Sequence, residues 1–143
     1  MRRTLWALSL APLLLMAPSA MADEKEAEQC LRSKIWAGYE DGWAVRTATT
    51  TSLEKASHRV YLVTLYQGNE YKFQVCGDKN TTNLDLILHD DQGKEVKRDQ
   101  SSDREPTLTY KPKATQTYYI AVYAADIAKE VEAAGVALAV TYK

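Results

Sequence analysis

The chain has 143 residues, 45% of them hydrophobic, and its 18 Lys and Arg against 19 Asp and Glu leave a net charge of −1. The basic residues do not cluster, so the sequence lacks the electrostatic footprint of a nucleic-acid-binding protein. After residue 22, no segment approaches the roughly 20 consecutive apolar residues of a membrane span. The composition therefore indicates one domain with a core of its own, with neither a nucleic-acid partner nor a transmembrane helix.

The first segment has the three parts of a secretory signal peptide. Met1-Arg2-Arg3 is basic, residues 5–17 are apolar, and Ala20-Met21-Ala22 is a small-x-small cleavage site. A buried amphipathic helix is the alternative, but no acidic residue precedes Asp23. We therefore predict a signal peptide over 1–22 and a periplasmic or secreted protein.

Two cysteines, Cys30 and Cys76, follow the cleavage site. In an oxidising compartment an isolated pair is most simply a disulfide. Closing a loop of this length contributes about 4 kcal/mol in the chain-entropy model. A redox or metal-binding pair is the alternative, but the spacing is not C-x-x-C and no histidine is near either residue. The sequence predicts a structural disulfide.

Residues 24–46 have the pattern of a helix. Glutamates fill the first turn, where the helix dipole favours negative charge, and Ala27, Leu31 and Ile35 recur at four-residue steps. Gly38 and Gly42 weaken the second half, so the helix is expected to break near Gly38. Residues 47–52 are β-branched and polar, which indicates a linker or a short edge strand. We assign 23–57 to this N-terminal helix and linker.

From residue 58 the hydrophobic period changes to two, as in strands. Leu84, Leu86 and Leu88 alternate with polar or outward positions, whereas 58–66 is apolar enough to be buried on both faces. Residues 124–134 have helical composition and predict a short helical turn. The expected strands are 58–66, 71–76, 84–89, 95–98, 107–110, 118–123 and 136–141. About seven short strands predict an all-β antiparallel sandwich over 58–143, with the helix tethered to it by the disulfide.

The order of these segments resembles the bacterial pre-peptidase C-terminal (PPC) domain over roughly residues 58–142. The resemblance rests on 63–71, 83–88, Asp90-Asp91-Gln92-Gly93, Leu108-Thr109-Tyr110-Lys111-Pro112 and 117–122. It implies a small jelly-roll-like β-sandwich with an accessory or adhesive role and no active site. Two features depart from that family: the chain has no room for the catalytic domain that usually precedes the module, and the helix carrying Cys30 is foreign to it.

Acidic residues concentrate between positions 77 and 103. Loop carboxylates are good calcium ligands, and some members of the family that the chain resembles bind calcium near such loops. The alternative is that these residues only form turns. The candidate calcium ligands are Asp85, Asp90, Asp91, Asp99 and Asp103, with Asp78 nearby.

Three aromatic residues, Trp36, Tyr39 and Trp43, share one face if the helix continues past Gly42. An exposed stripe of this kind would suit a carbohydrate or peptide ligand, but packing against the sandwich is the commoner explanation. Tyr119 and Tyr123 form a possible second patch, which cross-strand pairing explains equally well.

The only histidines, His58 and His89, belong to no metal-ligand or catalytic motif. The leading hypothesis is therefore a non-catalytic exported binding or accessory module of the bacterial envelope, whose partner is an unidentified protein or polysaccharide. A calcium-binding module with a site near residues 78–103 is the second hypothesis. A small secreted enzyme is the third. No cofactor is expected apart from calcium under the second hypothesis.

Overall fold

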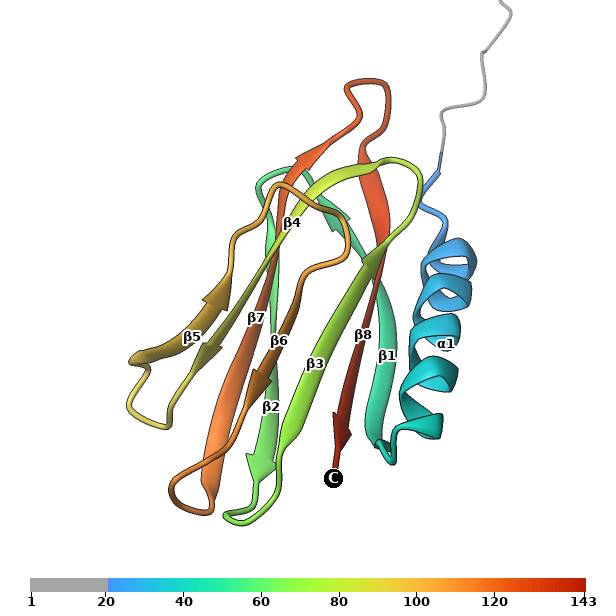
Figure 1. The fold of residues 1–143 in the computed structure, drawn as a ribbon. Helices are drawn as coiled ribbons and strands as arrows, with labels where there is room; N and C mark the ends of the chain where they lie inside the picture. The colour runs from blue at the N-terminus through green and yellow to red at the C-terminus, as the bar shows by residue number, and fades with distance from the viewer. Residues whose placement is uncertain (1–20) are drawn as a thin grey trace, which may run out of the picture.

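The structure is a computed structural model that describes residues 21–143, so the predicted signal peptide lies almost entirely outside the described residues. One helix precedes eight strands (Figure 1). Their bounds are α1 Glu24–Glu40, β1 Ala44–Glu54, β2 His58–Leu65, β3 Tyr71–Gly77, β4 Thr81–His89, β5 Glu95–Asp99, β6 Thr107–Tyr110, β7 Gln116–Ile127 and β8 Ala133–Tyr142. No helix within the described range is long and apolar enough to cross a membrane.

The strands form two antiparallel sheets of four, in the orders β1-β8-β3-β6 and β2-β7-β4-β5. Consecutive strands alternate between the two sheets except for β4 and β5, which pair in one sheet. This is the arrangement of an eight-stranded jelly roll. In Figure 1 the sheets lie face to face, with α1 outside the sheet that contains β1, β8 and β3. The predicted all-β sandwich with a preceding helix is confirmed.

The helix ends at Glu40, just after the predicted break near Gly38 and short of the end of the helical pattern at residue 46, and β1 follows almost at once. Gly42 adopts a left-handed φ of 85°, and its N–H donates to the Tyr39 carbonyl while that of Trp43 donates to Gly38. These two bonds form a Schellman motif, which terminates a helix. The segment expected to be a linker or short edge strand is the 11-residue edge strand β1, paired with β8. The structure therefore places the start of the sandwich at Ala44, ahead of the expected boundary at 58.

The expected helical turn over 124–134 is absent from the structure. Strand β7 continues to Ile127 and β8 begins at Ala133, which leaves only a short turn between them. The end of β7 pairs with β4, with Thr81 opposite Ile127. Pairing within the sheet satisfies the backbone groups of this alanine-rich segment, so tertiary context overrides its helical propensity.

The core lies between the two sheets and follows the predicted alternation. Leu84, Leu86 and Leu88 of β4 are completely buried there, together with Phe73 and Ile120 from neighbouring strands. The expectation that 58–66 is buried on both faces is wrong, because Val60 and Leu62 of β2 are 45% and 68% exposed. The only helix covers the other sheet, so nothing in the described chain packs on the outer face of β2.

The disulfide joins α1 to β3. Cys30 and Cys76 are bonded, with their Cα atoms 6.0 Å apart, which confirms the predicted pairing. Around this link, Ala27 and Leu31 of α1 pack against Ala137 and Ala139 of β8 in a small second core. The helix is thereby fixed to one sheet by a covalent bond and by apolar burial.

Candidate functional site

Basic and aromatic side chains gather at the end of the sandwich where the last turn of α1, the start of β1 and the end of β8 meet. We call this group, Trp43, Arg46, Tyr66, Lys72, Lys111 and Lys143, the basic–aromatic end. The C-terminus and the last turn of α1 lie at the same end of the sandwich in Figure 1.

Trp43 is the centre of this group. The Schellman turn after α1 places its side chain against Gly38, and only 6% of the residue is exposed. The ammonium group of Lys72 on β3 lies 4.1 Å from the centroid of the Trp43 ring. The ammonium group of Lys143, which follows β8, lies 4.6 Å from the same centroid. Cation–π attraction thus holds two positive charges beside one indole ring.

A third cation at this end of the sandwich lies over a different aromatic ring. The Arg46 guanidinium stands 5.9 Å above the Tyr66 ring, at the point where a bulge interrupts the pairing of β1 with β8. Together with Asn69, Tyr71 and Tyr142, these two residues line a shallow hollow of about 180 Å³. The hydroxyl oxygen of Tyr71 accepts the Tyr66 N–H at 2.9 Å, so the floor of the hollow is fixed to the backbone.

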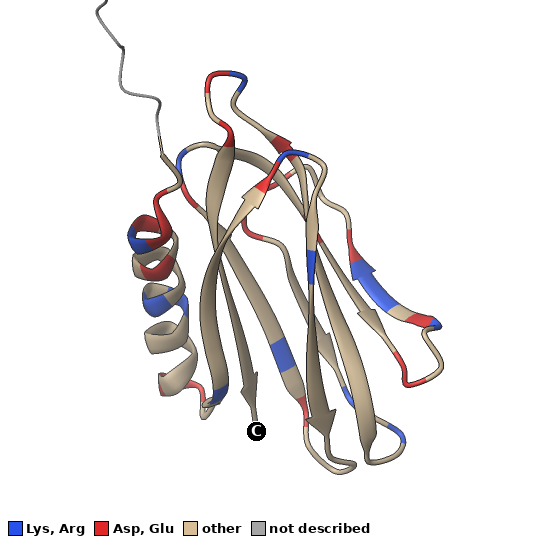
Figure 2. Ribbon diagram, turned by 180° about the vertical axis from the view of Figure 1, so that it is seen from behind, with Lys and Arg blue, Asp and Glu red and all other residues tan. Residues whose placement is uncertain are grey.

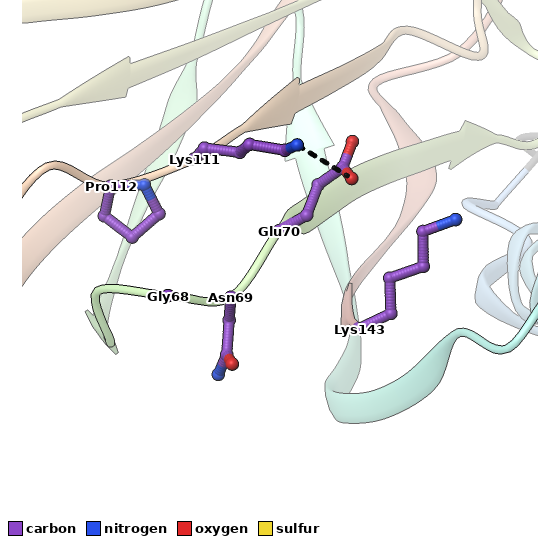
Figure 3. A pocket seen from close by; sticks show the side chains of 6 residues that line it. All are labelled: Gly68, Asn69, Glu70, Lys111, Pro112 and Lys143. Carbon is purple, nitrogen blue, oxygen red and sulfur yellow. Dashed lines mark ion pairs between the residues drawn. The ribbon is translucent and has the colours of Figure 1, made fainter.

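A neighbouring hollow of about 230 Å³ is shown in Figure 3. It is lined by Gly68, Asn69, Glu70, Lys111, Pro112 and Lys143. The Lys111 ammonium group points toward the Glu70 carboxylate, 3.8 Å away, and Lys143 projects on the other side of Glu70. The Glu70 and Lys143 backbones exchange two hydrogen bonds, so both side chains start from a rigid base.

Three of the four cations at the basic–aromatic end have no ion-pair partner among the described residues. Lys111 pairs with Glu70, but within residues 21–143 Arg46, Lys72 and Lys143 form no ion pair with a carboxylate. In Figure 2 blue segments lie on the strands near the end where the chain terminates. Ammonium and guanidinium groups beside aromatic rings favour carboxylate ligands, because charge-assisted hydrogen bonds to carboxylates are stronger than neutral ones.

The three aromatic residues named from the sequence do not form one stripe. Trp36 and Tyr39, on α1, are 69% and 66% exposed, with their rings edge to face at 6.1 Å. Trp43 lies beyond the end of the helix and is buried. Tyr119 and Tyr123 do share one face of β7: Tyr123 stacks on His58, and Tyr119 lies opposite Leu62 on the uncovered sheet.

The candidate calcium ligands are spread over several turns and a strand. Asp85 is on the outer side of β4 and Asp91 is exposed in the β4–β5 turn. Asp90 accepts N–H groups of Gln92 and Lys94, and Asp103 accepts that of Glu105. Within residues 21–143 the one group of three metal-ligating side chains close together is Cys30, Cys76 and Glu105, so these aspartates are not brought together.

Asp99 illustrates how the acidic loops are used. Its carboxylate accepts the N–H and hydroxyl of Ser101 and the N–H of Thr107. Partial burial by itself raises the pKa of Asp99, but these hydrogen bonds outweigh it and lower the pKa below its ordinary value. The carboxylate thus fixes the loop between β5 and β6.

The group of Cys30, Cys76 and Glu105 is a disulfide with a carboxylate beside it. The Glu105 Oε1 atom lies 3.1 Å from Sγ of Cys30, and the Lys34 ammonium group lies 3.2 Å from the same oxygen. Oxidised cysteines have no thiolate to offer a metal. The group therefore acts as part of the attachment of α1.

The sequence did not single out Arg46, Lys72 or Lys143. Each is an isolated basic residue in a different part of the chain: Arg46 is on β1, Lys72 is on β3 and Lys143 follows β8. Only the jelly-roll pairing of these strands brings the three to one end of the sandwich. One local signal was available in the sequence. Gly42 is a typical helix-ending residue, and reading it in that way would have placed Trp43 after the helix, next to the first strand.

No protein-family model matches the sequence, and no curated protein matches it significantly. Solved structures do resemble it. Aeromonas hydrophila PliG, a periplasmic lysozyme inhibitor of g-type lysozyme, is 17% identical with a TM-score of 0.54, over 70% of this chain and 88% of that one. The pre-peptidase C-terminal domain of the Bacillus anthracis collagenase is 16% identical with a TM-score of 0.51, over 67% and 89%.

The Yersinia pseudotuberculosis-derived mitogen is 14% identical with a TM-score of 0.50, over 66% of this chain and 83% of the other. At these identities the similarity concerns the fold. The chain has a PPC-like β-sandwich fold, as the resemblance in its sequence implied.

Proposed function

We propose that this chain is a non-catalytic exported module that binds a protein partner through the basic–aromatic end, and that it recognises an acidic segment of that partner. The observation that carries the proposal is the pair of ammonium groups, Lys72 and Lys143, held over Trp43 without a carboxylate partner. Two like charges at one ring repel each other, and a carboxylate bound between them relieves that repulsion. Export is supported by the predicted signal peptide, the disulfide and the periplasmic location of PliG.

A protein fits this surface better than a polysaccharide. Sugar rings stack on open, flat aromatic faces, whereas Trp43 is buried beneath its two lysines. The exposed rings of Trp36 and Tyr39 meet at 74°, so they form no common platform. An acidic protein segment needs only accessible cations and hydrogen-bond donors, which this end offers.

The proposal is tested with two defined anionic probes, a labelled decaglutamate peptide and polygalacturonate. The peptide should bind at low salt and bind more weakly as salt rises, because exposed charges are screened. The double variant Lys72→Gln/Lys143→Gln should lose most of this binding. The control Lys94→Gln/Lys129→Gln removes two exposed charges from other turns and should keep it. Preferential binding of polygalacturonate, or equal loss in both double variants, would contradict the proposal.

A second candidate function is inhibition of a cell-wall hydrolase, favoured by the similarity in fold to PliG. It is tested by adding the protein to a g-type lysozyme acting on a bacterial cell suspension. Slower clearing that depends on Lys72 and Lys143 would identify the acidic partner as a lysozyme. Unchanged clearing would reject this candidate without affecting the peptide result.

A further inference from the structure

A buried carboxylate joins three elements at the opposite end of α1. Asp78, in the turn between β3 and β4, has no exposed surface. Its Oδ2 atom accepts the N–H groups of Asp23 and Gly135, each at 2.8 Å. Its Oδ1 atom accepts the N–H of Asn80 at 2.9 Å and the Thr81 hydroxyl at 3.3 Å. The start of α1, the turn and β8 therefore share one acceptor.

This carboxylate forms no ion pair in the described chain. None of the ion pairs within residues 21–143 includes Asp78. The nearest guanidinium, that of Arg104, donates to the backbone oxygen of Asp78 at 3.3 Å and not to its side chain. Buried charges in proteins are normally paired, because desolvating an isolated carboxylate is costly. Asp78 thus has hydrogen-bond donors but lacks a counter-charge.

The missing charge is supplied if the chain is cut after Ala22, where the sequence predicts signal-peptide cleavage. Hydrolysis adds water across the Ala22–Asp23 peptide bond, leaving a carboxylate on Ala22 and an amine on Asp23 that takes up a proton at neutral pH. We propose that this processing converts the Asp23–Asp78 hydrogen bond into an ion pair between the new α-ammonium group and the buried carboxylate, which locks α1 onto the sandwich. Met21 is 83% exposed, so in the uncut chain the residue two positions before Asp23 already lies in solvent.

The surroundings suit an ammonium group at this position. A Cβ atom at Gly135 would lie 2.4 Å from the carbonyl carbon and oxygen of Asp23, so only glycine allows β8 to approach this closely. The Asp23 carboxylate accepts the Glu26 N–H at 2.9 Å and caps the helix. Its charge, with that of Glu24, offsets the repulsion between an ammonium group and the positive end of the helix dipole.

The test compares two forms of the disulfide-bonded protein, one beginning at Asp23 and one beginning at Met21. Each is made with Asp78 and with Asp78→Asn. At pH 6.5 the form beginning at Asp23 should melt about 5 °C higher, the shift expected for a charge-assisted bond in a domain of this size. Asp78→Asn should remove the difference between the forms, whereas the control Asp85→Asn should preserve it. Protein exported by the native host should begin at Asp23 by intact mass.

A pH series needs no variant and covers the case in which Asp78→Asn does not fold. An α-amine ordinarily has a pKa near 8, and its carboxylate partner raises that pKa in the folded protein. The extra stability is therefore full below about pH 8 and is lost as the pH rises through the raised value. The other charged groups on the elements packed here are Asp23, Glu24, Glu26, Lys79 and Arg104, and both forms contain them.

By about pH 10 the two forms should melt together, because the amine is then neutral. Equal melting temperatures at pH 6.5 would overturn the proposal. A difference that survives Asp78→Asn or persists at pH 10, or a native N-terminus other than Asp23, would also overturn it.

Discussion

The carbonyl oxygen of Gly38 accepts the N–H of Trp43 at 3.1 Å, and a Cβ atom at position 38 would lie 3.5 Å from the Trp43 Cβ, an ordinary contact distance. Alanine therefore fits where glycine now weakens the helix. Gly38→Ala should stabilise the protein by about 0.5–1 kcal/mol. Gly42→Ala should destabilise it, because Gly42 has a φ of 85°. Urea unfolding measures both, and a loss of stability at position 38 would contradict this packing.

Leu86 lies in the centre of the core on β4, without exposed surface. Leu86→Ala removes buried methyl groups and leaves a cavity, so it should cost about 2–5 kcal/mol of unfolding free energy. Lys94→Ala, in the exposed β4–β5 turn, should change stability by less than about 0.5 kcal/mol. Equal small effects in denaturant titration would mean that the inward face of β4 is assigned wrongly.

The bond between Cys30 and Cys76 closes a loop with a sequence separation of 46. Removing it as Cys30→Ala/Cys76→Ala should cost about 4 kcal/mol, chiefly by freeing the unfolded chain. Intact mass before and after reduction should differ by two hydrogen atoms, and no thiol should react with an alkylating agent beforehand. Two reactive thiols in the unreduced protein would refute the bond.

Asp99 has a lowered pKa because hydrogen bonds from Ser101 and Thr107 outweigh the effect of partial burial. A lowered folded-state pKa stabilises the protein above the unfolded value, near 4, and this contribution disappears as the pH falls through the folded value. Asp99→Asn should therefore make the melting temperature less dependent on pH between about 5 and 2. The same measurement on Asp91→Asn, at an exposed turn position, controls for the loss of one surface carboxylate.

Calcium binding near residues 78–103 stays a prediction that a melting experiment decides. A bound ion would stabilise the protein by about 2.7 kcal/mol at a hundredfold excess over Kd, a rise of roughly 5–10 °C. Because Asp90, Asp99 and Asp103 already accept backbone N–H groups, we expect millimolar calcium to leave the melting temperature of chelator-stripped protein unchanged. A rise that a chelator reverses and Asp85→Asn weakens would establish the site.

Much of the fold follows from local pattern. The alternation at Leu84, Leu86 and Leu88 marked a half-buried strand, and the isolated cysteine pair indicated the bond that fixes α1. Strand β1 was harder to predict. An edge strand that is exposed along most of its length needs no hydrophobic alternation, and its threonines are equally typical of a linker. The prediction of a helical turn over 124–134 was wrong because the alanines of this segment favour a helix, whereas the strand residues with which it pairs are distant in the sequence.

The basic–aromatic end was not predictable for the same reason. Lys72 follows a tyrosine in an alternating strand, where lysine usually marks the solvent side, and it is half-buried over Trp43. Its relation to Lys143 depends on the pairing of β3 with β8, which joins residues on distant parts of the chain. Pairing between strands this far apart cannot be predicted from the residues of a short segment alone.

The position of β8 has a consequence for the order in which the domain folds. β8 is the last of the eight strands, yet it lies in the interior of its sheet, hydrogen-bonded to β1 on one side and β3 on the other. That sheet is incomplete until residues 133–142 have joined it, because β1 has no other partner strand in the sheet. The N-terminal strand therefore acquires its backbone partners only from the last strand to be synthesised, so the pairing that completes the sheet joins residues far apart in the sequence.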